Sequence, residues 1–370
     1  MVFVELAPEL VHQIYNTLYS INDVINLSLT CRRFNVLLKH SQKLPTLFAA
    51  AEREFGPLED VAQLVTFNAS QPAHLKRHPQ QNYALLRQMI KIGGVAQKCA
   101  DIFPERRWQD NYLERRTLSN DEVWRLRRAV YRYWLYCEAF QGRGNSRSMR
   151  MLPYMVEERA QLLRTWTTEE LSEIEDVRLV LEDLVSLELC PTHGAAQREF
   201  NQHCDFAEVR QTHQNVYTHR SWNSWPPDSF TSQLLSTNIF HNYRDEQILS
   251  RHLDLPVPQR RKLEMMGWGD EISQYYVVQS MMKLNPAQIM YLYEHTTRKQ
   301  DIERWLAEHI GEEWFWDNGQ TWLDTWNLVL YKRGLDPEWL QLEIQEGRAG
   351  VTNKAGSSDQ HIEQNHQCLY

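Results

Sequence analysis

The feature that most constrains this chain is a run of three short helical patterns between residues 4 and 42. In the first pattern, apolar side chains recur every four residues and so share one face of a helix: Leu6, Leu10, Ile14 and Leu18. Pro8 is suited to the first turn of that helix, where its missing N–H costs no hydrogen bond. That apolar face must pack against a partner.

The next two patterns begin at residues that commonly cap helices. Ser20 and Asp23 have the spacing of a capping box and predict a very short second helix that carries Val24, Ile25 and Leu27. Thr30 is placed to cap a third helix, with these residues on one side: Cys31, Phe34, Leu37 and Leu38. A domain of about 40 residues buries too little surface to be stable alone. We therefore expect this segment to bind a partner protein.

This segment resembles the F-box, the helical module that docks substrate receptors onto the Skp adaptor of Skp–cullin–F-box ubiquitin ligases. The run LSLTCRRF, residues 27–34, carries most of the resemblance. The family pattern opens with Leu-Pro, whereas here Leu6 is followed by Ala7 and the proline stands at position 8. A later phrase, RLRRAVYRYWLYCEAF at residues 125–140, resembles a segment in the body of fungal F-box proteins.

The resemblance implies a receptor that binds a Skp-type adaptor, reaches the cullin through it and recruits an unknown protein substrate for ubiquitination. It assigns these residues to adaptor binding: Leu6, Pro8, Leu10, Ile14, Leu18, Val24, Leu27, Cys31 and Phe34. Such a receptor acts by proximity and needs neither catalytic residues nor a cofactor. One alternative is an F-box-bearing structural or regulatory protein that recruits no ubiquitination substrate. Two others are a helical domain that merely begins with three amphipathic helices, and an unrelated helical metalloenzyme.

The composition narrows the classes of protein to which this chain can belong. The chain has 370 residues, of which 42% are hydrophobic and 24% charged, enough for a sizeable core. A formal net charge of −8 argues against a general nucleic-acid binder. Six scattered cysteines show no disulfide framework and favour a reducing, intracellular location in the cytoplasm, the nucleus or both. Without a basic leader or an apolar run of about 20 residues, we expect neither secretion nor a membrane span.

Helical periodicity dominates the rest of the chain, so the expected fold is all-α. The predicted divisions are an F-box at 4–42, an irregular helical domain for substrate or partner binding at 43–346, and a disordered tail at 347–370. Helices are predicted on both sides of Gly56-Pro57, then after a loop at 68–81. A helix is predicted at 83–92, and another begins at a capping box of Ser119 and Glu122 and stops at Gly142 and Gly144. The further predicted helices are two within 152–189, and 259–266, 270–283, 285–293, 299–310, 320–332 and 336–345. No leucine-rich, kelch or WD repeat is present.

Two groups of side chains qualify as candidate sites in the middle of the chain. Cys190, His193, His203 and Cys204, with His213 and His219 beyond, have ligand types that suit zinc. Because His203 and Cys204 are adjacent and point apart on a helix, we predict no metal site. Trp222 and Trp225, beside Pro226-Pro227, are the candidate substrate-binding residues, since aromatic side chains often anchor partners. Trp322 and Trp326, four residues apart, are instead predicted to lie in the core.

An arginine-rich stretch between residues 106 and 132 has two interpretations. It either binds an acidic partner or forms a helix flank that pairs with interleaved carboxylates and stacks on aromatic rings. We favour the second, since acidic residues lie close by in sequence: Glu105, Asp110, Glu114, Asp121 and Glu122. Finally, no nucleophile elbow, phosphate-binding glycine loop or metalloprotease helix occurs, so we expect no enzymatic activity.

Overall fold

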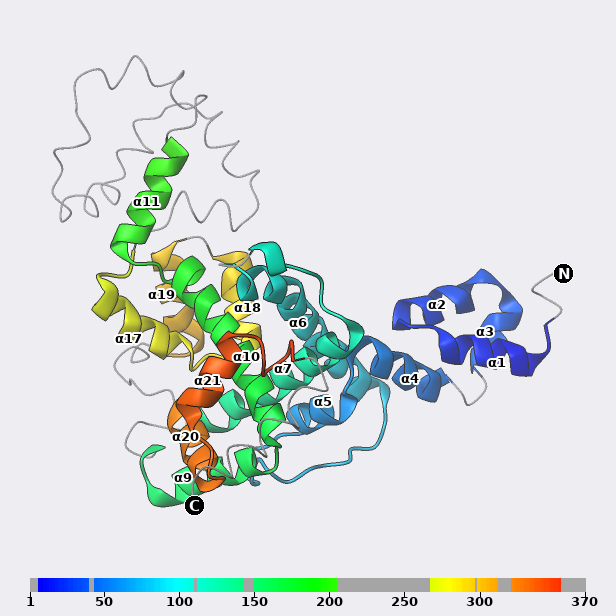
Figure 1. Ribbon diagram of the computed structural model, residues 1–370. Helices are drawn as coiled ribbons and strands as arrows, with labels where there is room; N and C mark the ends of the chain where they lie inside the picture. Colours follow the sequence, from blue (N-terminus) through cyan, green and yellow to red (C-terminus); the bar gives the residue numbers. More distant parts are fainter. Residues whose placement is uncertain are drawn as a thin grey trace, which may run out of the picture. The chain divides into compact units, whose positions relative to one another are not determined.

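The computed structural model describes residues 6–39, 43–109, 112–142, 150–204, 267–296, 298–311 and 321–353. These residues form fifteen α-helices, a short 3-10 helix and a π-helical turn, and they contain no strand (Figure 1). The predicted all-α class is confirmed.

The chain divides into two compact units. The described residues of Met1–Val180, Asn285–Ala287 and Thr321–Tyr370 belong to the first unit, and those of Leu181–Leu284 and Gln288–Gln320 belong to the second. The first unit holds the N-terminal helices and a large helical body.

The first three helices are α1 (Pro8–Thr17), α2 (Ile21–Thr30) and α3 (Arg32–Lys39). Ser20 Oγ accepts a hydrogen bond from the Asp23 amide at 3.0 Å, as its spacing predicts. The prediction of a very short second helix is wrong, because α2 contains neither glycine nor proline to end it and is as long as α1. Thr30 ends α2 instead of capping α3, and its hydroxyl donates to the Leu27 carbonyl oxygen at 2.7 Å.

Gly56 and Pro57 separate α4 (Lys43–Phe55) from α5 (Leu58–Val65), as predicted. The helix expected to end at residue 92 is longer, because α6 runs Tyr83–Arg107 straight through Gly93 and Gly94. A Cβ at Gly93 would lie 2.5 Å from the Phe55 ring. That glycine therefore allows α4 to pack closely on α6 and does not terminate the helix.

The body of the first unit is completed by α7 (Asn120–Phe140), α9 (Pro153–Arg164), α10 (Thr168–Leu184), α20 (Trp322–Lys332) and α21 (Pro337–Gln345); the last residues of α10, from Leu181, belong to the other unit. Helix α7 starts with the predicted capping box of Ser119 and Glu122. Trp322 and Trp326 are fully buried, which confirms their core position. The Trp322 ring meets Tyr136 edge-on, with ring centroids 5.0 Å apart.

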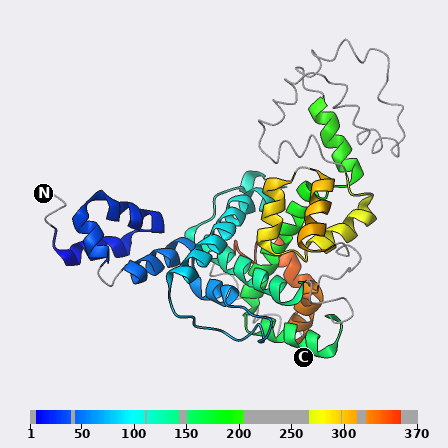
Figure 2. The ribbon, with the colours of Figure 1, turned by 180° about the vertical axis from the view of Figure 1, so that it is seen from behind.

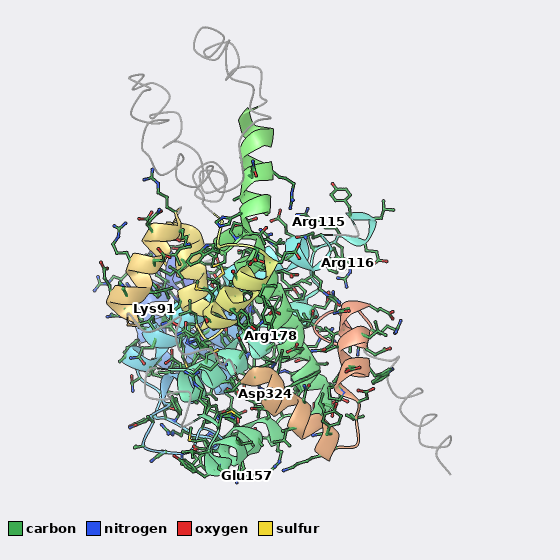
Figure 3. The ribbon with its side chains drawn as sticks, turned by 90° about the vertical axis from the view of Figure 1, so that its left-hand side faces the viewer. Lys91, Arg115, Arg116, Glu157, Arg178 and Asp324 are labelled. Carbon is green, nitrogen blue, oxygen red and sulfur yellow. The ribbon has the colours of Figure 1, made fainter. Side chains whose placement is uncertain are left out.

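The arginines near α7 pair mainly with carboxylates distant in sequence, which corrects part of the prediction. Arg116 pairs with the nearby Glu122 and stacks on Trp108, as expected. However, Arg128 pairs with Glu173 of α10 at 2.7 Å. A second such pair joins Arg132 to Asp60 of α5 at 2.8 Å. Figure 3 labels Arg115 and Arg116, which follow the 3-10 helix η2 (Tyr112–Glu114).

The second unit contains a π-helical turn, η3 (Val185–Leu189), then α11 (His193–Cys204), α17 (Glu271–Met281), α18 (Pro286–His295), whose first residues belong to the other unit, and α19 (Lys299–His309). The Cys190 amide donates to the Val185 carbonyl oxygen at 2.7 Å and widens the last turn. This shift explains why Leu187 is half exposed although it continues the apolar stripe of α10. The helix expected at 259–266 lies outside the described residues.

Residues 347–353, which we expected within a disordered tail, are packed against the first unit. Val351 is fully buried, and its amide donates to Asp176 Oδ2 at 2.9 Å. Arg125 donates to the Asn353 carbonyl oxygen at 2.6 Å. The error arose because this segment has few apolar residues and is held mainly by hydrogen bonds.

Candidate functional site

Helices α1, α2 and α3 share a small apolar core, and α4 also contacts α1 and α2. The buried side chains are Val11, Tyr15, Ile21, Val24, Phe34 and Leu38. Tyr15 crosses this core and donates its hydroxyl hydrogen to the Phe34 carbonyl oxygen at 3.2 Å. Burial, with a smaller effect from Cys31, raises the pKa of Tyr15 to about 12, so the hydroxyl stays a donor at neutral pH.

The nine residues assigned to adaptor binding occupy three different environments. Val24 and Phe34 lie inside the core, and Pro8 and Leu10 are exposed. The others are half-buried: Leu6, Ile14, Leu18, Leu27 and Cys31. Because Val11 and Tyr15 supply the buried face of α1, the face with Leu10 and Ile14 is turned toward solvent. Val24 and Phe34 therefore support the surface from within and do not form it.

Other apolar residues of this segment, which the resemblance does not assign to adaptor binding, are exposed. They are Tyr19, Ile25, Leu29 and Val36. Leu29 is 70% exposed and Leu10 is 46% exposed. Ile25 and Leu29 stand four residues apart on α2, and this spacing could have identified a second face. We use the name apolar surface for the exposed side chains of Leu10, Ile25, Leu29 and Val36 taken together. Groups of exposed apolar residues commonly mark protein-binding sites.

Two side chains of α4 connect α1–α3 to the body of the first unit. Glu54 Oε2 accepts the amide hydrogen of Ile21 at 2.8 Å, at the start of α2. Arg53 Nε donates to the Leu18 carbonyl oxygen, also at 2.8 Å, just beyond the end of α1. Both bonds satisfy backbone groups at helix ends, which otherwise lack partners. They fix the connecting turn between α1 and α2 onto α4.

Some of the other candidate residues lie outside the described residues. Trp222 and Trp225 fall there, as do His213 and His219. Cys190 is buried at the end of η3, and His193 is exposed at the start of α11. His203 and Cys204 are the last turn of α11. Among the residues that the structure describes, no three His, Cys, Asp or Glu side chains are grouped to hold a metal ion.

No family model, no curated protein and no solved structure matches this chain. Within the described ranges, no helix has both the length and the apolar character needed to cross a membrane.

Proposed function

We propose that this chain is an F-box adaptor protein, which binds the Skp subunit of a cullin ubiquitin ligase and recruits a protein substrate for ubiquitination. One observation carries the proposal: the core side chains of α1–α3 are buried, yet Leu10, Ile25, Leu29 and Val36 remain exposed. Burial in a protein interface would remove this apolar surface from solvent, at about 25 cal/mol per Å². The resemblance of the LSLTCRRF run to the F-box is our reason for proposing a Skp-type adaptor as the partner.

The chain acts in this proposal as a non-catalytic receptor inside the cell. Its N-terminal helices bind the adaptor, and the helical body binds the substrate. Holding the substrate near the catalytic subunits of the ligase raises its local concentration there, so two interfaces of moderate affinity are sufficient. The hydrogen bonds of Arg53 and Glu54 support this role, because they fix the adaptor-binding helices to α4.

A charge placed in the apolar surface tests adaptor binding. Leu10→Glu should weaken binding to a purified Skp-type adaptor by at least tenfold, since an unpaired carboxylate would be desolvated in the interface. Leu75→Glu is the matched control, because Leu75 is 48% exposed in the loop before α6, close to the 46% of Leu10. Both variants should keep the helical circular-dichroism spectrum and the melting temperature of the unchanged protein.

Calorimetric titration with the adaptor gives the answer. Full binding by Leu10→Glu, or no binding by the unchanged protein, would contradict the proposal. Phe34→Glu provides a further comparison, because Phe34 is buried in the core of α1–α3. It should lose adaptor binding together with the folded structure of these helices, while residues 43–353 keep their melting transition.

Substrate recruitment needs a separate measurement in cells. If the chain is a receptor, at least one bound protein should become more abundant when residues 4–42 are deleted. Unchanged abundance of every bound protein would favour a structural role for an adaptor-bound chain.

A further inference from the structure

Helices α18 and α19 of the second unit end in the same five-residue motif, an aromatic residue followed by Leu, any residue, Glu and His. The two copies are Tyr291–His295 and Trp305–His309. In both copies the leucine is buried and the histidine is exposed. The repeat is visible in the sequence, but its significance depends on how the two helices meet.

The rings of the two copies form two stacked pairs, which meet at a contact tilted by 31°. His295 lies on Tyr291 with centroids 4.3 Å apart and an angle of 12° between the ring planes. His309 lies on Trp305 at 4.7 Å and 13°. Tyr291 and Trp305 then join the two pairs, with centroids 5.7 Å apart. Figures 1 and 2 show α18 and α19 side by side in opposite views. We call Tyr291, His295, Trp305 and His309 the paired-ring surface.

Both histidines are held in the same tautomer. Nδ1 of His295 lies 3.0 Å from the Tyr291 carbonyl oxygen, and Nδ1 of His309 lies 3.0 Å from the Trp305 carbonyl oxygen. Because a carbonyl oxygen only accepts, each Nδ1 must carry the hydrogen. Nε2 of each neutral ring is then a hydrogen-bond acceptor.

One nearby charge, that of Glu308, also favours a cationic ligand. The two basic side chains of α19 are ion-paired within that helix, Lys299 with Glu303 and Arg304 with Asp301. Glu308, next to His309, is exposed and has no ion pair among the described residues. Glu294 holds the equivalent position in the first copy of the motif. The surface thus combines partly exposed aromatic rings, imidazole acceptors and the Glu308 carboxylate.

We propose that the paired-ring surface binds an arginine-bearing segment of a protein partner. A guanidinium group is planar, so it stacks on aromatic rings. It also donates several N–H groups in fixed directions, which can serve the imidazole and carboxylate acceptors of this surface. A lysine ammonium group lacks the plane that stacks, and an acidic segment would be repelled by Glu308. This inference rests on the proposed function, since it assigns the recruited protein to this surface.

The test uses the full chain and three fluorescein-labelled peptides of equal length. Each alternates Gly-Ser spacers with four arginines, four lysines or four glutamates. In fluorescence anisotropy the arginine peptide should bind at least threefold more tightly than the lysine peptide, and the glutamate peptide should not bind. Added salt should weaken the binding of the arginine peptide.

Substitutions test whether the arginine peptide binds at the paired-ring surface. Trp305→Ala should weaken the arginine peptide by about 3- to 30-fold, the range of one cation–π contact. Glu308→Gln should weaken binding of the arginine peptide about two- to fivefold. Because this variant changes only an exposed charge, it should stay folded even where Trp305→Ala unfolds. Tyr331→Ala, which removes an exposed tyrosine from α20 in the first unit, is the matched control and should change nothing.

Equal affinity for the arginine and lysine peptides would overturn the proposal, and so would unchanged binding by both Trp305→Ala and Glu308→Gln. Leu10→Glu should bind the arginine peptide as the unchanged protein does, because Leu10 lies in the N-terminal helices. A failure of adaptor binding is therefore distinguishable from a failure of the paired-ring surface.

Discussion

Glu175 and Arg178, one turn apart on α10, form a bidentate ion pair that solvent does not reach. Arg178 Nε lies 2.8 Å from Glu175 Oε2, and its Nη2 lies 2.9 Å from Oε1. The same carboxylate accepts the Trp322 indole hydrogen at 2.6 Å and a hydrogen from Gln341 at 3.5 Å. One buried carboxylate therefore joins α10 to both α20 and α21.

Glu175→Gln should strongly destabilise the first unit. The neutral amide leaves the Arg178 guanidinium buried without the Glu175 charge, and breaking a buried pair in this way costs about 3–5 kcal/mol. Urea unfolding followed by circular dichroism measures the change. The control is Glu157→Gln, which removes a carboxylate from an exposed pair with Arg164 and should change stability very little. Figure 3 labels Arg178 among the helices and Glu157 at the lower edge of the molecule. Similar losses in the two variants would contradict this prediction.

Gly350→Ala should destabilise the protein for two separate reasons. The residue has φ of +88°, which costs an L-amino acid about 1–2 kcal/mol. An added Cβ would also lie 2.6 Å from Asp176 Oδ2, and the fully buried Asp176 has little room to move. Overpacking of this kind adds about 1–3 kcal/mol.

Gly334→Ala isolates the first of these reasons. Gly334 has φ of +74°, but nothing lies within 4 Å of its Cβ position. The stability of this variant should fall by about 1–2 kcal/mol, which is the conformational cost of a positive φ alone. Equal destabilisation of the two variants would show that the contact with Asp176 carries no cost.

The sequence predicted the elements that depend on local signals. The capping box of Ser119 and Glu122 and the break at Gly56-Pro57 involve neighbouring residues, and both were located correctly. The helix predicted at 83–92 was too short, because the role of Gly93 depends on Phe55, which belongs to another helix. Arg128 and Arg132 were paired with the wrong carboxylates for the same reason. Long-range pairing cannot be read from spacing alone.

The candidate site shows the same limit. An apolar residue every four positions located the outward face of α1 with Leu10, but the pattern does not distinguish a face that packs inside from one that stays exposed. Val24 and Phe34 were therefore grouped with surface residues although they are buried. The paired-ring surface was missed because its motif is short, and only the contact between Tyr291 and Trp305 reveals that the copies act together.

Asp176 gives the first unit a specific response to pH. Its carboxylate lies 3.2 Å from Arg107 Nε and accepts the Val351 amide hydrogen, while Glu173 and Glu175 are the nearby acidic groups. Burial is the largest effect on this group and outweighs the attraction of Arg107. It raises the pKa of Asp176 from its ordinary value of 3.8 to about 6.

The raised pKa of Asp176 fixes the sign of the expected effect on stability. Between about pH 4 and pH 6 the folded protein holds a proton on Asp176 that the unfolded chain has released, so acidification stabilises the folded state through this group. The free energy of unfolding of the unchanged protein, minus that of Asp176→Asn, should therefore rise as pH falls from 7 to 4. The rise should be on the order of 3 kcal/mol, since each pKa unit corresponds to about 1.4 kcal/mol. Urea titrations of both proteins at intervals of half a pH unit measure it, with Asp324→Asn, on the exposed side of α20, as the control for loss of one negative charge. A difference that falls on acidification would mean that the ion pair with Arg107, and not burial, dominates the energetics of Asp176.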